Sequence, residues 1–216
     1  MIDDVFVCDV LHNLEANFHL RMEMPDDTIK PTFDIRNWRG EPLPRQAFTV
    51  RVKGWSEKDA ETYEVPTMMI RHLPHMVKGY GVFLSEKAAS VFKRFDLGNA
   101  SLYAVPFYEN DDTTFIETRY DLNFGNVKRG YRPDKSPKVN EQHGVRDIYY
   151  YIYTPSTDFD VVLTSNVLVG PELWVDPLIS NAFFVSGALV RAIEVEGMAA
   201  DFNFKRCRII DVQEDN

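Results

Sequence analysis

The chain has 216 residues, of which 44% are hydrophobic and 13% aromatic, so it can bury a substantial core and is not expected to be disordered. Acidic side chains outnumber basic ones by 33 to 24, and the formal net charge is -9. This charge disfavours nucleic acid or a membrane as a partner, and it favours a cationic partner or simple solubility.

The first predicted element is a helix within residues 5–20. Apolar residues recur there at helical steps, at Val7, Leu11, Leu14 and Phe18. The opening letters VFVCDV are equally compatible with a strand. On a helix, His12, Glu15 and His19 would share a second face.

The next segment, from residue 24 to 46, contains four prolines that interrupt regular structure. We predict a structured loop there, with one short strand around Thr32–Arg36. Alternation of apolar and polar residues over Phe48–Trp55 then predicts a half-buried strand. The acidic letters of Ser56–Glu61 predict a solvated turn.

Two stretches about a hundred residues apart share one pattern. Each has an aromatic and an aliphatic residue, a serine, apolar residues at helical spacing, a glycine and a short apolar alternation. Ser85 and Ser186 are predicted N-caps, because a hydroxyl there accepts from an unpaired first-turn amide. Gly98 and Gly197 are predicted to end the two helices. The alternation after the second helix predicts one strand through Cys207.

Further strands are predicted in the tyrosine-rich Asp147–Thr154 and in Asp158–Ser165. The whole pattern predicts an α+β fold, with helices packed on an antiparallel or mixed sheet and two similar strand–helix–strand units, about residues 79–106 and 181–210. A loop- and strand-rich part, 1–72, precedes residues 73–212. No low-complexity linker separates them, so we expect one continuous compact domain.

Cys8 and Cys207 stand near opposite ends of the chain without a CxxC pair, so we expect reduced thiols, with Cys207 buried. The sequence begins with acids where a secretory signal needs basic residues. No apolar run approaches the roughly 18 residues of a membrane span. The expected location is the cytoplasm.

His12, Glu15 and His19 offer two imidazoles and a carboxylate, a set that can bind a metal ion. An exposed helical stripe is the favoured interpretation, because no known metal motif accompanies these residues. The sequence contains no GxSxG, GxGxxG or GxxxxGK[ST] frame. We therefore predict no catalytic residue, no cofactor and no metal, and a binding protein rather than an enzyme.

Four strings beyond residue 72 are together similar to one known family. They are Phe95-Asp96-Leu97-Gly98, Leu122-Asn123-Phe124-Gly125-Asn126, Leu173-Trp174-Val175-Asp176-Pro177 and Arg206-Cys207-Arg208. As a set they resemble the immunity protein 11 family of bacterial polymorphic toxin systems, formerly a domain of unknown function. The similarity extends over roughly Leu73 to Ile210. We expect the strings themselves to serve core packing, turns and local hydrogen bonds.

The resemblance implies a non-catalytic cytoplasmic protein that binds and neutralises a cognate secreted toxin, encoded by an adjacent gene, and so protects the producing cell. It implies steric inhibition and leaves the oligomeric state open. A small metal-dependent or hydrolytic enzyme that uses His12, Glu15 and His19, or dispersed acids, is the alternative.

Acidic residues provide the candidate surface for a cationic toxin cleft, because acidic patches steer such partners. Two clusters qualify, Glu57, Asp59 and Glu61 in one predicted turn, and Glu109, Asp111 and Asp112 in another. For either cluster taken alone, a solubilising loop is the preferred interpretation.

Overall fold

The computed structural model describes residues 2–10, 12–13, 19–24, 30–43, 45, 48–54, 73–79, 81–109, 111, 113–143, 148–152, 154 and 156–211. The α-helices are α1 (Lys30–Trp38), α4 (Glu86–Phe92) and α5 (Gly187–Val195). The strands are β1 (Val5–Asp9), β2 (His19–Glu23), β3 (Thr49–Gly54), β4 (Met76–Lys78), β5 (Val82–Leu84), β6 (Ser101–Tyr108), β7 (Phe115–Asn123), β8 (Val139–His143), β9 (Ile148–Ile152), β10 (Val162–Thr164), β11 (Leu173–Trp174), β12 (Ala182–Ser186), β13 (Phe204–Arg206) and β14 (Arg208–Ile210).

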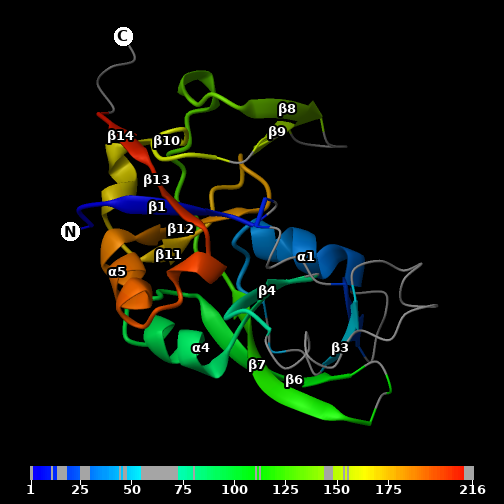
Figure 1. The fold of residues 1–216 in the computed structure, drawn as a ribbon. Helices are drawn as coiled ribbons and strands as arrows, with labels where there is room; N and C mark the ends of the chain where they lie inside the picture. Colours follow the sequence, from blue (N-terminus) through cyan, green and yellow to red (C-terminus); the bar gives the residue numbers. More distant parts are fainter. Residues whose placement is uncertain are drawn as a thin grey trace.

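Two larger sheets organise the molecule, which confirms the predicted α+β class (Figure 1). One sheet has the strand order β11-β12-β1-β13, and the other has the order β2-β3-β6-β7-β5-β4. The pair β3–β6 is parallel and every other pair in these two sheets is antiparallel. Two further pairs, β8–β9 and β10–β14, lie outside them.

The two sheets contain the same motif twice. The order β4-β5-β7-β6 in one sheet corresponds to β11-β12-β1-β13 in the other. In each set the second strand leads into a helix, which returns to the last strand. The predicted similar units are therefore β5–α4–β6 and β12–α5–β13. Their central strands differ in origin, because β7 follows β6 whereas β1 comes from the start of the chain.

Serine N-caps begin both helices as predicted. The Ser85 hydroxyl accepts from the Ala88 amide at 3.2 Å, and the Ser186 hydroxyl accepts from the Leu189 amide at the same distance. Gly197, at φ 74°, ends α5 as predicted, with the Gly197 amide bonded to the carbonyl of Glu194.

The second predicted helix end is wrong. The helix α4 stops at Phe92, and Gly98 lies in a later turn at φ 55°. Tight bonds from the amides of Arg94 and Phe95 to carbonyls three residues earlier close the last turn before that glycine.

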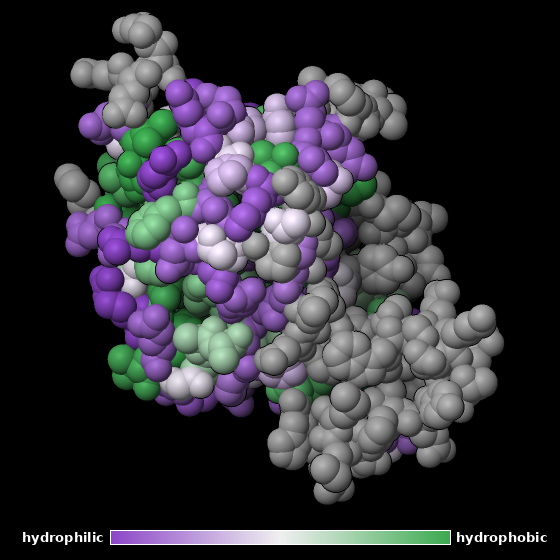
Figure 2. Space-filling view, turned by 45° about the horizontal axis from the view of Figure 1, so that its top comes forward, coloured by the Kyte–Doolittle hydropathy of each residue, from purple (hydrophilic) through white to green (hydrophobic). Residues whose placement is uncertain are grey.

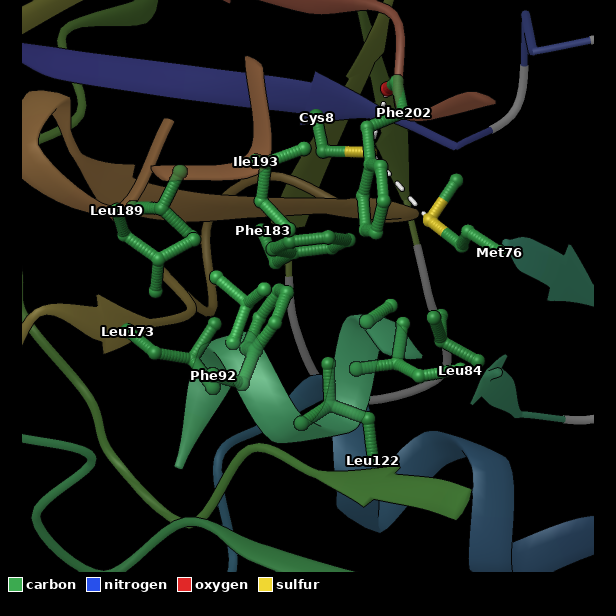
Figure 3. Close-up of a cluster of buried hydrophobic side chains, with 14 of the residues drawn as sticks. Cys8, Met76, Leu84, Phe92, Leu122, Leu173, Phe183, Leu189, Ile193 and Phe202 are labelled. Atoms are coloured by element: carbon green, nitrogen blue, oxygen red, sulfur yellow. Dashed lines mark hydrogen bonds between the residues drawn. The ribbon is translucent and has the colours of Figure 1, made fainter. Parts of the chain in front are cut away.

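The main core lies between the two sheets and includes residues of α4 and α5. In it Phe92 stacks on Phe202 with ring centroids 6.0 Å apart. Figure 3 shows that Cys8 points toward Phe202 and Met76, and its sulfur lies 3.0 Å from the Phe202 carbonyl oxygen. Separate buried clusters contain Val5, Val7 and Trp174 on one side of this core, and Phe83 and Phe107 on the other.

Three predicted elements are corrected. Val5–Asp9 and His19–Glu23 are strands, so the helix predicted within residues 5–20 is wrong at both ends and the alternative of a strand at VFVCDV is confirmed. The short strand predicted around Thr32–Arg36 is instead part of α1, and Pro31 in the first helical turn is compatible with a helix, because a missing amide hydrogen costs nothing there.

The single predicted strand through Cys207 is two strands, β13 and β14, which pair with β1 and β10 respectively. The strands predicted near Phe48–Trp55, Asp147–Thr154 and Asp158–Ser165 are present as β3, β9 and β10. Within the described residues, no helix has the length and apolar character needed to cross a membrane.

Candidate functional site

Three of the four strings behind the family resemblance meet at one place. The Asn126 amide group donates to the carbonyls of Leu97 at 2.7 Å and Leu173 at 2.9 Å, and its oxygen accepts from the Asn99 amide at 2.8 Å. One side chain therefore connects all three strings. Its bonds go to backbone groups, which is an architectural role.

Asp176 forms a second node of this network. Its fully buried carboxylate accepts from the amides of Gly130 and Tyr131, both at 2.8 Å, and from that of Leu178 at 3.0 Å. The neighbouring Trp174 is buried under the ammonium group of Lys128, whose nitrogen lies 3.8 Å from a ring centroid. Buried packing and local hydrogen bonds are the functions expected of these residues.

The fourth string lies at the β13–β14 junction. Cys207 is buried there, as predicted, and its amide donates to the Val5 carbonyl at 2.8 Å. Cys8 and Cys207 are both free thiols. Burial raises the pKa of each thiol above its ordinary value, which leaves little reactive thiolate at neutral pH.

The proposed histidine face is not carried by one helix. His12 follows β1 and its Nδ1 lies 2.9 Å from the carboxylate of Asp9, whereas His19 begins β2 and pairs with Gly54. Glu15 lies outside the described residues. In the part of the chain that the structure describes, no three His, Cys, Asp or Glu side chains are grouped so that they could hold a metal ion.

A serine–histidine contact does exist elsewhere. His75 Nδ1 lies 2.8 Å from Ser85 Oγ, and the Ser85 amide donates to the His75 carbonyl at 2.9 Å. The second unit has the same arrangement with Glu172 in place of His75, since both the hydroxyl and the amide of Ser186 donate to Glu172. Because a carboxylate takes the place of the imidazole in the second unit, we interpret the His75–Ser85 contact as structural. It connects the helix N-cap to the start of the neighbouring strand.

The acidic cluster near residue 110 occupies the turn of the β6–β7 hairpin, whose strands lie at the lower edge of the molecule in Figure 1. The Asp111 carboxylate accepts from the Thr113 amide at 3.0 Å and from the amide and hydroxyl of Thr114. These bonds lower the pKa of Asp111 to about 2, so it stays ionised at neutral pH. Phe115, beside the turn, is 55% exposed.

The remaining acidic candidates lie mostly outside the described residues. Glu57, Asp59 and Glu61, and also Asp112, lie outside the described residues. Glu109 is partly exposed, and its amide donates to the Thr114 carbonyl at 2.9 Å across the hairpin. The structure therefore places Glu109 and Asp111 in the same connection between β6 and β7.

Two buried carboxyl groups were missed by the sequence reasoning. Asp34 on α1 and Asp121 on β7 have three carboxylate oxygens between them that are buried without a hydrogen-bond partner. Burial raises the pKa of Asp34 to about 6 and that of Asp121 to about 7. Strand alternation offered one signal, because Arg119, Asp121 and Asn123 occupy one face of β7.

The surface of the molecule carries hydrophilic and hydrophobic side chains in unequal amounts. On the face drawn in Figure 2, the described surface is mostly hydrophilic and its hydrophobic areas are small and separate. Exposed large apolar side chains include Phe115 in the hairpin, Phe159 and Val195.

Comparison with known proteins adds no family assignment. Neither a scan against protein-family models nor a search of curated proteins gives a match for this chain. The resemblance to the immunity protein 11 family therefore remains a prediction from the four strings.

Proposed function

We propose that this chain is a non-enzymatic immunity protein of the cytoplasm, which neutralises a cognate toxin by binding it. The observation that carries the proposal is the meeting of three resemblance strings around Asn126. Strings scattered over the surface would be weak grounds for a shared fold. Strings joined by hydrogen bonds to one buried asparagine support a common architectural core.

The turn of the β6–β7 hairpin is the proposed contact with the toxin. It combines the acids Glu109 and Asp111 with the exposed ring of Phe115, which packs edge-on against Tyr108 at a centroid distance of 5.9 Å. Aromatic side chains are enriched at the cores of protein interfaces, and acidic groups beside them steer a cationic partner during association. With a net charge of -9, such a surface suits a toxin with a cationic cleft, such as a nuclease.

The hydrogen bonds inside the turn support a steric mechanism. Because Asp111 already accepts three bonds from Thr113 and Thr114, fixing this side chain costs little conformational entropy when the hairpin docks. A preorganised acidic turn can occupy a cleft that otherwise receives an anionic substrate. No chemical step is required of the immunity protein.

The first test uses the reading frame adjacent to the gene. We expect its product to inhibit growth when expressed alone, and to copurify with this chain and lose toxicity when both are expressed. A neighbouring product that is toxic but neither binds this chain nor is neutralised by it would contradict the proposal.

The second test examines the hairpin. Glu109→Lys with Asp112→Lys reverses two acids and leaves the turn-forming Asp111 in place. We expect the association rate with the toxin to fall about tenfold at low salt and to lose much of its salt dependence, because electrostatic steering acts mainly on association.

A matched control is Asp3→Lys with Glu194→Lys, which makes the same charge change at two exposed positions outside the hairpin. Stopped-flow association at several ionic strengths compares the two. If both double variants slow association equally, the effect is one of net charge and the hairpin is not the contact.

A further inference from the structure

Helix α1 is attached to β7 by a row of polar side chains. The Asn37 oxygen accepts from the Asn123 side-chain amide at 3.0 Å and from the Phe124 amide at 2.9 Å. The Asn37 amide group donates to the Leu122 carbonyl at 2.9 Å. Both asparagines are buried, and this row satisfies its hydrogen bonds.

The next row of the same interface contains two carboxyl groups. Asp34 lies three residues before Asn37 on α1, and Asp121 lies two residues before Asn123 on β7, so each shares the face of its neighbour. Asp121 is 1% exposed, and neither of its carboxylate oxygens has a partner. A Cβ atom built on Gly81 would lie 2.9 Å from its Oδ1, so the carboxyl is enclosed from the β4–β5 turn as well.

The second unit shows that the fold does not require an acid at this position. Phe83 pairs with Asp121 in the first unit, and the matching Phe184 pairs with Val7 in the second. Val7 is fully buried in an apolar cluster. A valine therefore fills the place that Asp121 occupies, and the buried carboxyl is a specific feature of the first unit.

The charges around the pair come from several elements. Lys78 at the end of β4 interacts with Asp34, and also with Asp9 at the end of β1. Tyr103 on β6 pairs with Asp121, and its hydroxyl donates to the Leu43 carbonyl at 3.0 Å. Phe83 on β5 carries no charge. The Lys78 ammonium also donates to the Asn181 side chain at 3.1 Å, so it is shared among several groups.

We propose that Asp34 and Asp121 form a proton-linked latch that holds α1 on β7 while a carboxyl is protonated and loosens α1 when both ionise. A protonated carboxyl adds a hydrogen-bond donor to this row, whereas two ionised carboxylates repel each other and leave Asp34 Oδ1 and both Asp121 oxygens without a hydrogen-bond partner. Loosening of α1 would also weaken the packing of Trp38 on Phe124, whose ring centroids are 4.9 Å apart.

The direction of the pH effect follows from burial. Burial raises the pKa of Asp34 to about 6, and burial together with the charge of Asp34 raises that of Asp121 to about 7. In the released state both acids titrate near their ordinary value of about 4. The docked state therefore holds protons that the released state has lost, and docking weakens as pH rises from about 4 to about 7 and levels off above that range.

Hydrogen–deuterium exchange of the full chain at pH 5.5, 6.5, 7.5 and 8.5 tests the latch. Protection factors, corrected for the intrinsic pH dependence of exchange, are compared for α1 and for α5, which carries no buried acid. We expect α1 protection to fall by up to about tenfold per pH unit for each proton released, while α5 stays constant.

Asp121→Val copies the residue of the second unit, and Asp121→Asn keeps the shape of the side chain. Both are expected to raise α1 protection at pH 8.5 and to flatten its pH dependence. Asp34→Asn is a second route to the same result if an Asp121 variant does not fold. Protection of α1 that is constant with pH in the wild type, or that falls equally in these variants, would overturn the latch.

Discussion

At the scale of single residues, the choice of amino acid is restricted where two backbone segments lie too close together for a side chain. Gly125 has φ 58°, and a Cβ atom there would lie 2.2 Å from the carbonyl oxygen of Asn99. Gly197 has a similar φ of 74°, but nothing lies within 4 Å of its would-be Cβ. A side chain at Gly197 would therefore cost only the strain of a left-handed backbone, whereas a side chain at Gly125 would add a steric clash.

We predict that Gly197→Ala lowers the free energy of unfolding by about 1 kcal/mol, the cost of a left-handed alanine. Gly125→Ala is expected to cost at least about 3 kcal/mol, because the backbone must also shift. Urea denaturation of both variants measures the difference. Equal losses of unfolding free energy in the two variants would contradict this prediction, because the backbone around Asn99 would then move away from the new methyl group at no cost.

At the scale of elements, helices α4 and α5 begin in the same way and for the same reason. Each of these N-cap hydroxyls accepts a hydrogen bond from a first-turn amide and also contacts the side chain directly before the neighbouring strand, His75 for Ser85 and Glu172 for Ser186. Strand, cap and helix are thereby connected in each unit. The β6–β7 hairpin is held in a comparable way by Asp111, whose carboxylate closes the turn.

Loss of either cap should weaken its helix by a similar amount. We expect Ser85→Ala and Ser186→Ala each to lower the free energy of unfolding by about 1 to 2 kcal/mol, because an amide and a strand contact lose their partner. The control is Ser90→Ala at an exposed position inside α4, where alanine is the better helix former. A loss at Ser90 that matches the losses at the caps would contradict this account.

For the whole molecule, the two units share one core and depend on both ends of the chain. Strand β1 lies between β12 and β13, so the second unit is incomplete without the N-terminal strand. Cys8 of β1 lies in the core between the sheets, and Cys207 lies in the cluster on the far side of β1. Both thiols are buried from solvent by the assembled sheets.

Thiol reactivity should therefore report unfolding. We predict that neither Cys8 nor Cys207 reacts with an aromatic disulfide reagent in the native protein at pH 7, and that both react after denaturation in guanidinium chloride. Burial removes access and also raises the pKa of both thiols. Release of the coloured thiolate is followed by absorbance, and rapid modification of the native protein would contradict the packing described here.

Several features were determined by the sequence alone, because they depend on neighbours in the chain. The alternation around Thr49–Gly54, the serine caps and the stop at Gly197 are local patterns, and all three are present. The similarity of the two units was also visible, since each repeats one pattern of cap, helix and strand.

Other features were decided only by tertiary contacts. Strand Val5–Asp9 lies between two strands from the far end of the chain, and this pairing overrides the helical spacing of its apolar residues. The segment near Thr32 became α1 because its polar face bonds to β7 through Asn37. The carboxyl pair of Asp34 and Asp121 exists only because α1 packs on that strand. Residues far apart in the chain become neighbours by packing, and no local pattern records this.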